Sequence, residues 1–180
     1  VVVIYPAGIC YLQVKADDVP DIIDQTIKEQ KVVEHLLYVD PETGEKAVHE
    51  ADIPFYKHQQ RTLICNNIRI DSKSIDDYLA IEGYSALAKA LSRMTPEKVL
   101  EEVKASNLRG RGGGGFPAGR KWEGSRNDSE PIKYVIVNAD EGDPGAFMDR
   151  ALLEGNPHAI LEGLIIGGYA IGSHEGYIYV

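Results

Sequence analysis

The sequence has few cysteines and no excess of positive charge. Its two cysteines, Cys10 and Cys65, lie far apart without close-spaced partners, so neither a disulfide framework nor a metal or iron–sulfur ligand set is indicated. We expect both to be small buried residues on strands, in a protein of the reducing cytoplasm. Acidic residues outnumber basic ones by 28 to 19. This argues against a nucleic-acid partner, because such surfaces need clustered Lys and Arg.

A signal peptide and a long apolar run are also missing. The longest apolar stretch, AILEGLIIGGYAIG, is too short and too glycine-rich to span a bilayer, so direct membrane insertion is not expected. The composition, 43% hydrophobic and 26% charged, is typical of a soluble globular protein. The chain starts on VVVIY without Met and stops on GYIYV. We therefore expect a piece of a longer polypeptide, in which a functional site is incomplete.

The first part of the chain predicts a hairpin followed by a helix. VVVIYP and ICYLQV favour strands on either side of a turn at Ala7-Gly8. The following helix, over 17–30, is expected to start at Asp17 or Asp18 and to carry one apolar stripe. The stripe consists of Val19, Ile22, Ile23 and Ile27. A hairpin and one helix are too small to fold alone. Residues 39–54 are polar without periodicity and predict a linker, and RTLICNNIRI predicts a strand-like or extended segment.

Helix-capping residues and apolar runs predict the elements of the second part. Expected N-caps are Ser74, Thr95 and Asn156, with Gly83 and Gly172 beyond helix ends and a further helix over YSALAKALSR. Strand 134–137, helix 157–171 and strand 177–180 together predict a parallel βαβ unit. Ligands bind outside the carboxyl ends of strands in open parallel sheets, so the long loop at 138–156 is the first place to look for a site.

A glycine-rich stretch, NLRGRGGGGFPAGRKW, occupies residues 107–122. It satisfies G-x-G-x-x-G literally, but a helix rather than a strand precedes it, and four consecutive glycines match almost any glycine pattern. A backbone without side chains can adopt positive φ and present bare N–H groups to an anion, and Lys121 would bind a phosphate. The alternative is a flexible hinge. A hinge does not need the neighbouring aromatic and cationic residues, which are Phe116, Trp122, Arg109, Arg111, Arg120 and Lys121.

A second stretch, NADEGDPGAFMDR, concentrates acidic residues directly after the predicted strand. Carboxylates there would accept hydrogen bonds from sugar or ribityl hydroxyls, and they would disfavour a phosphorylated ribose. The spacing is unlike that of a calcium loop. A merely solvated acidic loop would not explain Pro144-Gly145 followed by Ala146-Phe147-Met148. The five histidines are scattered and show no metal spacing, and Gly163, Gly167 and Gly168 predict close helix packing.

Together, LRGRGGGGFPAGRKW and VNADEGDPGAFMDRALLEGNPHAILEGLIIGGYAIG closely resemble the NADH-binding flavoprotein subunits of complex I, NAD(P)-linked iron-only hydrogenases and related formate dehydrogenases. The resemblance runs from Ser106 to Val180, and DEGDPGAFMDR is closest to the hydrogenase beta-subunit type. Departures are Gly114, Ala118 and Gly124, where the family usually has Ala, Thr and an aromatic residue.

The resemblance implies which residues bind the cofactors. Gly110, Arg111, Gly112 and Lys121 would line the FMN phosphate. Asn138, Asp140 and Glu141 would face the ribityl chain or flavin, and Phe116 would stack near the nicotinamide or adenine beside Asp143. No catalytic side chain and no metal ligand are implied. The candidate cofactor-binding residues are Gly110, Arg111, Gly112, Gly113, Gly115, Phe116, Lys121, Asn138, Asp140, Glu141 and Asp143.

The implied fold is α/β. Residues 96–180 would be the N-terminal part of a Rossmann-like domain that binds FMN and NADH. Residues 1–38 would be the C-terminal remnant of a thioredoxin-like ferredoxin domain, with a linker and short helices over 39–95. The ligands of the implied 4Fe–4S and 2Fe–2S clusters would lie outside this chain.

The implied function is electron transfer: hydride moves from NAD(P)H to FMN, and single electrons pass to iron–sulfur clusters. The setting would be an NAD(P)-linked hydrogenase, with iron–sulfur and hydrogenase subunits as partners. Alternatives are a complex I type NADH:quinone oxidoreductase subunit and a non-redox nucleotide-binding module. The chain by itself is expected to be inactive and to bind FMN weakly or not at all.

Overall fold

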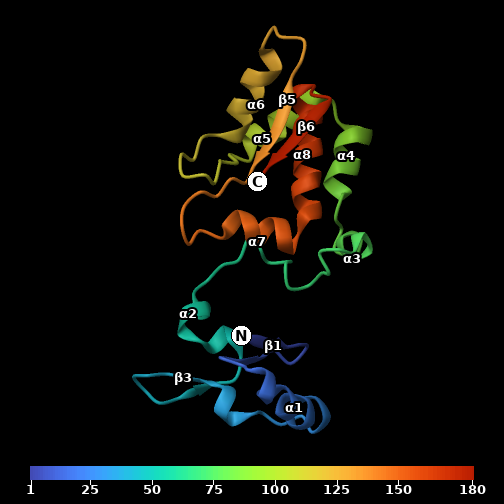
Figure 1. Cartoon of the computed structure of the whole chain (residues 1–180). Coiled ribbons are helices and arrows are strands. Elements are labelled where there is room, and N and C mark those ends of the chain that lie inside the picture. The colour runs from blue at the N-terminus through green and yellow to red at the C-terminus, as the bar shows by residue number, and fades with distance from the viewer. The chain divides into compact units, whose positions relative to one another are not determined.

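The computed structural model describes residues 1–180, which divide into two compact units, residues 1–60 and 61–180 (Figure 1). Both mix helices with small two-stranded sheets. The first unit contains two antiparallel hairpins, β1 (Val2–Ile4) with β2 (Ile9–Tyr11) and β3 (Tyr38–Val39) with β4 (Lys46–Ala47). Its helical segments are η1 (Ala16–Asp18), α1 (Val19–Asp21), η2 (Ile22–Lys28), η3 (Glu34–Leu36), η4 (Glu50–Asp52) and α2 (Pro54–Lys57). The predicted N-terminal hairpin is confirmed.

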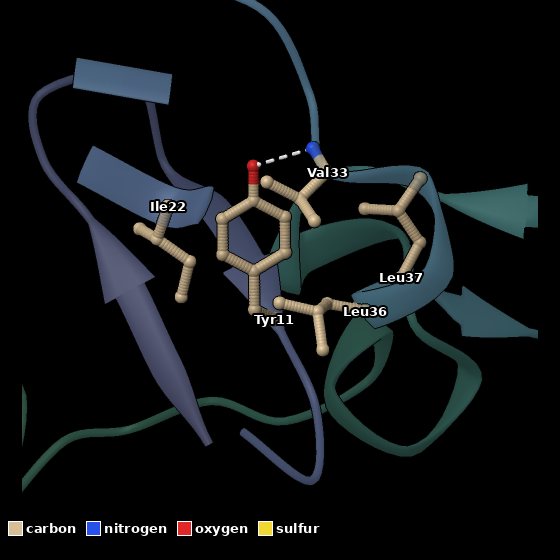
Figure 2. Close-up of a cluster of buried hydrophobic side chains, with 5 residues drawn as sticks. All are labelled: Tyr11, Ile22, Val33, Leu36 and Leu37. Atoms are coloured by element: carbon tan, nitrogen blue, oxygen red, sulfur yellow. Dashed lines mark hydrogen bonds between the residues drawn. The ribbon is translucent and has the colours of Figure 1, made fainter. Parts of the chain in front are cut away.

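The core of the first unit is built around Tyr11, which is fully buried. Figure 2 shows its ring among four other buried side chains, Ile22, Val33, Leu36 and Leu37. Its hydroxyl lies 2.6 Å from the Thr26 hydroxyl and accepts a hydrogen bond from the Val33 N–H at 3.0 Å. The phenol therefore satisfies two buried polar groups while its ring fills the core.

Replacing Tyr11 by phenylalanine is expected to lower the free energy of unfolding by about 1–3 kcal/mol, because the Val33 N–H and the Thr26 hydroxyl lose their partner. Denaturant unfolding gives the size of this loss, and faster hydrogen exchange at Val33 gives its location. Tyr5→Phe is the matched control, since that side chain is 55% exposed. Equal unfolding midpoints for the two variants would contradict the assigned role of the Tyr11 hydroxyl.

The predicted apolar stripe on the first helix is only partly buried. Ile22 faces the core, whereas Val19, Ile23 and Ile27 are 45%, 44% and 56% exposed. The reason is the winding of η2, which is a π-helix. Its wider turn places Thr26, four residues after Ile22, on the buried side in place of the predicted isoleucines.

Residues 39–54, predicted as a linker, form most of the β3–β4 hairpin and the turn η4. They are tied to the N-terminal hairpin by a hydrogen bond from the Cys10 N–H to the Val48 carbonyl, 2.8 Å long. This part of the chain is thus integrated into the first unit. The proposed domain boundaries at 38/39 and 95/96 remain predictions.

The second unit is mainly helical and contains one pair of strands. Its elements are α3 (Ile75–Ala80), α4 (Ser85–Arg93), α5 (Pro96–Ala105), α6 (Ala118–Asn127), β5 (Tyr134–Asn138), α7 (Met148–Gly155), α8 (Pro157–Ile171) and β6 (Glu175–Tyr179). Strands β5 and β6 are parallel, with Ile136 opposite Tyr177. Because α7 and α8 lie between them in the chain, the predicted parallel strand–helix–strand connection is confirmed. Helix α8 contacts β5, α4, α5 and α6 and so forms the centre of the unit.

The predicted helix starts in this unit are confirmed. The side chains of Ser74, Thr95 and Asn156 each accept a hydrogen bond from the backbone N–H three residues later. Gly172 ends α8 with a φ of +78°, a conformation that favours glycine because it has no Cβ. Two further helices, α6 and α7, are not predicted by the sequence patterns.

The segment RTLICNNIRI is not a strand, contrary to the prediction. It forms successive turns, with hydrogen bonds from the Asn67 N–H to the Ile64 carbonyl and from the Arg69 N–H to the Asn66 carbonyl. Cys65 is exposed here, so the prediction of a buried cysteine is wrong for this residue. It is correct for Cys10, which is buried on β2.

Close packing against α8 is confirmed at two of the three glycines predicted for it. A Cβ on Gly167 would lie 3.3 Å from the Trp122 ring and 3.4 Å from Val135. A Cβ on Gly168 would lie 3.5 Å from Val135, whereas one on Gly163 would contact nothing. Trp122 is partly buried and packs against the hydrophobic core of this unit. It is therefore a packing residue of α6.

A buried carboxylate holds the segment around α3 and α4 against α8. Glu162, only 8% exposed, accepts hydrogen bonds from the Tyr78 hydroxyl at 2.5 Å and from the backbone N–H groups of Tyr84 and Leu87, both at 3.0 Å. Burial raises the pKa of Tyr78 well above its ordinary value, and the hydrogen bond and charge of Glu162 raise it further. His158, one turn earlier on α8, bonds the Tyr84 hydroxyl at 2.9 Å and stacks on Tyr78.

The chain contains no helix with the length and hydropathy of a membrane span.

Candidate functional site

The glycine-rich stretch folds into a closed hairpin loop between α5 and α6, here called the glycine hairpin (residues 108–118). Its base is fixed by two backbone hydrogen bonds, Ala118 N–H to Leu108 C=O at 2.8 Å and Gly110 N–H to Phe116 C=O at 2.9 Å. The Arg109 guanidinium adds a third bond across the loop, to the Gly115 carbonyl at 3.1 Å. These contacts favour a defined loop over the alternative of a flexible hinge.

The tip of the glycine hairpin presents backbone N–H groups without partners in the chain. None of the amides of residues 111–115 donates an intramolecular hydrogen bond. Gly113 and Gly115 have φ values of +95° and +58°, which explains why glycine occupies these positions. A Cβ built on any of the four glycines at 112–115 would have no atom within 4 Å. The tip therefore offers free N–H donors and open space beside them, as an anion-binding nest requires.

The charged and aromatic neighbours of the hairpin fall into two groups. Arg111, Arg120 and Lys121 are exposed and form no ion pair, so their charges are available to an anionic ligand. Phe116 is 55% exposed at the hairpin. Arg109, in contrast, bonds the Gly115 carbonyl within the loop, and Trp122 is partly buried against the hydrophobic core.

The acidic loop (residues 138–147) leaves the carboxyl end of β5 and turns back sharply. The turn spans Asp143 to Ala146, whose N–H bonds the Asp143 carbonyl at 3.0 Å. With Pro144 second and Gly145 third at a φ of +86°, it has the features of a type II turn. Asn138 accepts a hydrogen bond from the Asp140 N–H at 3.2 Å. The carboxylates of Asp140 and Asp143 are exposed and have no partner in the chain.

Glu141 differs from its acidic neighbours, because its carboxylate is bonded within the chain. It accepts hydrogen bonds from the backbone N–H groups of Asp149 at 2.7 Å and Arg150 at 3.0 Å, in the first turn of α7. Partial burial raises the pKa of Glu141, but the N–H groups of Arg150, Asp149 and Met148 outweigh this and hold the pKa below its ordinary value. Glu141 thus acts as the N-terminal cap of α7, a role that sequence reasoning missed.

In the view of Figure 1 the glycine hairpin, at the lower end of α6, and the acidic loop after β5 lie on the same side of the second unit. No hydrogen bond or ion pair joins them. The structure therefore brings together the candidate residues within each loop, and a pocket shared by the two loops stays a prediction.

The comparisons with known proteins match the same segments. Residues 103–180 match the family model of the Nuo51 FMN-binding domain. The NADP-reducing hydrogenase subunit HndC of Solidesulfovibrio fructosivorans is 53% identical over 124 residues, which are 69% of this chain and 25% of that protein. The F subunit of the NADH-quinone oxidoreductase of Aquifex aeolicus is 52% identical over 107 residues, 59% of this chain and 25% of that protein.

A solved structure extends the likeness over nearly the whole chain. A chain of an NAD+-reducing NiFe hydrogenase in the air-oxidized state matches with a TM-score of 0.52 and 28% identity, over 96% of this chain and 26% of that one. The chain thus spans about a quarter of the length of the curated relatives it matches. Both loops described above lie inside the segment matched by the family model. Over residues 103–180, the chain is thus similar to the Nuo51 FMN-binding domain family.

Proposed function

We propose that this chain is part of an NAD(P)H dehydrogenase flavoprotein subunit, in which the glycine hairpin and the acidic loop together bind FMN and NAD(H). The observation that carries the proposal is the set of unpartnered N–H groups at 111–115, which lie next to unpaired cations in a segment of the FMN-binding family. The same segment is shared with relatives that are named as a hydrogenase subunit and as NADH-quinone oxidoreductase subunits.

The residues present fit the phosphate of FMN. A phosphate dianion needs several N–H donors that converge without side chains in between, and positive φ at Gly113 and Gly115 is the kind of backbone conformation from which such nests are built. Arg111 and Lys121 would supply charge-assisted contacts. Gly110 and Gly112 would complete the phosphate side of the site.

The remaining candidate residues fit the uncharged parts of the ligands. Asn138, Asp140 and Asp143 carry exposed polar side chains that would accept hydrogen bonds from ribityl or ribose hydroxyls. Phe116 would stack on the nicotinamide or adenine ring, since aromatic rings pair favourably with flat ligand rings. The resemblance places Glu141 in the same group, but its carboxylate is directed to α7.

Bound FMN would supply the redox chemistry, accepting a hydride from NAD(P)H and passing single electrons to iron–sulfur clusters in adjoining domains. The side chains of this chain would bind and orient the reactants. None of them is needed as a general base.

The named relatives support a proposal for the enzyme complex to which this chain contributes. A hydrogenase and a quinone-linked complex are both represented among them, so we propose iron–sulfur and hydrogenase subunits as partners, with a complex I type assembly as the second candidate.

We also propose that residues 96–180 form the start of a Rossmann-like domain, which the parallel pair β5–β6 supports. A thioredoxin-like origin of residues 1–38 is supported by the hairpin and the following helix, and a cytoplasmic location by the low cysteine count.

The test uses the intact protein that contains this chain. It is expected to purify with stoichiometric FMN, and the flavin absorbance is expected to bleach when NADH or NADPH is added without oxygen. The kcat/KM ratio for the two nucleotides then gives the preferred donor, and hydrogen or quinone as acceptor separates the two settings. Binding of nucleotide without any bleaching would identify a non-redox module instead. The 180 residues alone are expected to hold FMN weakly.

A further inference from the structure

The acidic residues after β5 differ in what their carboxylates do. Asp140 and Asp143 are exposed and have no partner in the chain. Glu141 is less exposed and bonds two backbone N–H groups of α7. The carboxylates of Asp140 and Asp143 are therefore free for a ligand, whereas that of Glu141 is bonded to α7, although the three acids form one cluster in the sequence.

The backbone at Glu141 supports this division. Its φ is +41°, in the left-handed region that residues with a Cβ seldom adopt. Such a conformation is retained where surrounding contacts over-determine it. Here those contacts are the hydrogen bonds at 2.7 and 3.0 Å to Asp149 and Arg150. They close the acidic loop against α7 into a ring, by joining residues that are eight and nine positions apart in the chain.

We propose that Glu141 is a positioning residue of the flavin site, which holds the acidic loop in its binding conformation by capping α7, and that it does not itself bind the cofactor. The inference rests on the proposed function, because it assigns Glu141 a role toward the same site. Asp140 precedes Glu141 directly, and Asp143 lies inside the closed ring. Fixing Glu141 on α7 therefore limits where both free carboxylates can lie.

The α7 side of the ring is itself anchored. The Asn67 side chain donates a hydrogen bond to the Ala151 carbonyl at 2.7 Å. A Cβ on Gly155, at the end of α7, would overlap the Asn67 side chain, so the helix and residue 67 are in close contact. The cap at Glu141 thus ties the acidic loop to a helix that is held in place from its other side.

The first test is hydrogen exchange of the cofactor-free intact protein. Glu141→Ala is expected to speed exchange at Asp149 and Arg150 by roughly five- to tenfold, the effect of losing a charged helix cap. Glu141→Gln should recover part of the protection, because its amide oxygen accepts one N–H bond without the charge. Asp140→Asn is the matched control. It removes one negative charge from the adjacent residue, and no change in the exchange rates of Asp149 and Arg150 is expected.

The second test is FMN affinity, measured by flavin fluorescence. Glu141→Ala is expected to raise the dissociation constant about as much as it speeds exchange, roughly five- to tenfold, with Glu141→Gln in between. Normal exchange at Asp149 and Arg150 in Glu141→Ala would overturn the inference alone. So would a large loss of FMN affinity in Glu141→Gln with amide protection intact, since Glu141 would then be a direct ligand. Wild-type protein that binds no FMN would overturn the proposed function instead.

Discussion

Replacing Glu162 by alanine is expected to lower the free energy of unfolding of the second unit by about 3 kcal/mol, the largest stability effect among the predicted substitutions. Three donors lose their common acceptor: the Tyr78 hydroxyl and the N–H groups of Tyr84 and Leu87. Each belongs to the α3–α4 segment, whereas Glu162 lies on α8. The substitution therefore removes the polar link between these parts of the unit and leaves buried donors unsatisfied.

Denaturant unfolding of Glu162→Ala, Glu162→Gln and Glu102→Ala measures this effect. Glu162→Gln is expected to lose less than Glu162→Ala, because its amide oxygen still accepts some of the bonds while its NH2 group faces donors. Glu102 is the matched control: it pairs with Lys89 at 2.8 Å but is 57% exposed, so its removal should cost under about 0.5 kcal/mol. A similar loss for Glu102→Ala and Glu162→Ala would show that the buried network does not stabilise the unit.

Much of the second unit could be predicted because its helix starts are encoded locally. Ser74, Thr95 and Asn156 are followed by helical residues, and their side chains cap the helices as expected. Capping depends on neighbours three residues away, so sequence is sufficient to find it. The parallel pairing of β5 with β6 was also predictable, since an apolar strand, a helix and another strand follow one another in the sequence.

The errors lie where distant contacts decide the local structure. Helix α6 contains Gly119 and Gly124, which weaken the helical signal, but Trp122 packs against Gly167 of α8 and stabilises it. The apolar segment 61–70 has strand-like composition but no strand to pair with, and it forms turns. At α6 tertiary packing outweighs propensity, and at 61–70 the lack of a partner strand does.

The candidate site could be located from sequence but not resolved into roles. A glycine-rich stretch followed by an acidic stretch identifies the two loops in the sequence, and the family match covers both. That the Glu141 carboxylate is used by α7 could not be predicted. It depends on a φ of +41° and on a helix that the sequence patterns do not reveal. Residue type alone gives Asp140 and Glu141 the same assignment, although only Glu141 has partners in the chain.

Alanine substitutions in the glycine hairpin are expected to have the largest effect on cofactor binding. Gly113→Ala places a Cβ on a residue with a φ of +95°, which costs about 1–2 kcal/mol. Because the hairpin tip is exposed, the loop should relieve this strain by shifting rather than by unfolding the unit. The amides would then no longer converge, and FMN affinity should fall by on the order of tenfold to thirtyfold.

Neighbouring glycines and a distant one serve as controls for this prediction. A Cβ on Gly114 contacts nothing, and its φ is not positive, so Gly114→Ala should leave the cofactor-free protein unchanged. Its FMN affinity should fall only if the ligand approaches the backbone closely. Gly44, in the turn between β3 and β4, has a φ of +73° and equally open surroundings.

Gly44→Ala therefore carries the same type of strain in the first unit and should leave FMN affinity unchanged. Titration of each variant with FMN, followed by flavin fluorescence, measures these effects. If Gly113→Ala binds FMN as wild type does, the tip amides are not the phosphate site. An equal loss in Gly44→Ala would assign the effect to general strain. A loss in both Gly113→Ala and Gly114→Ala, with Gly44→Ala unaffected, would require the phosphate to contact the bare backbone itself.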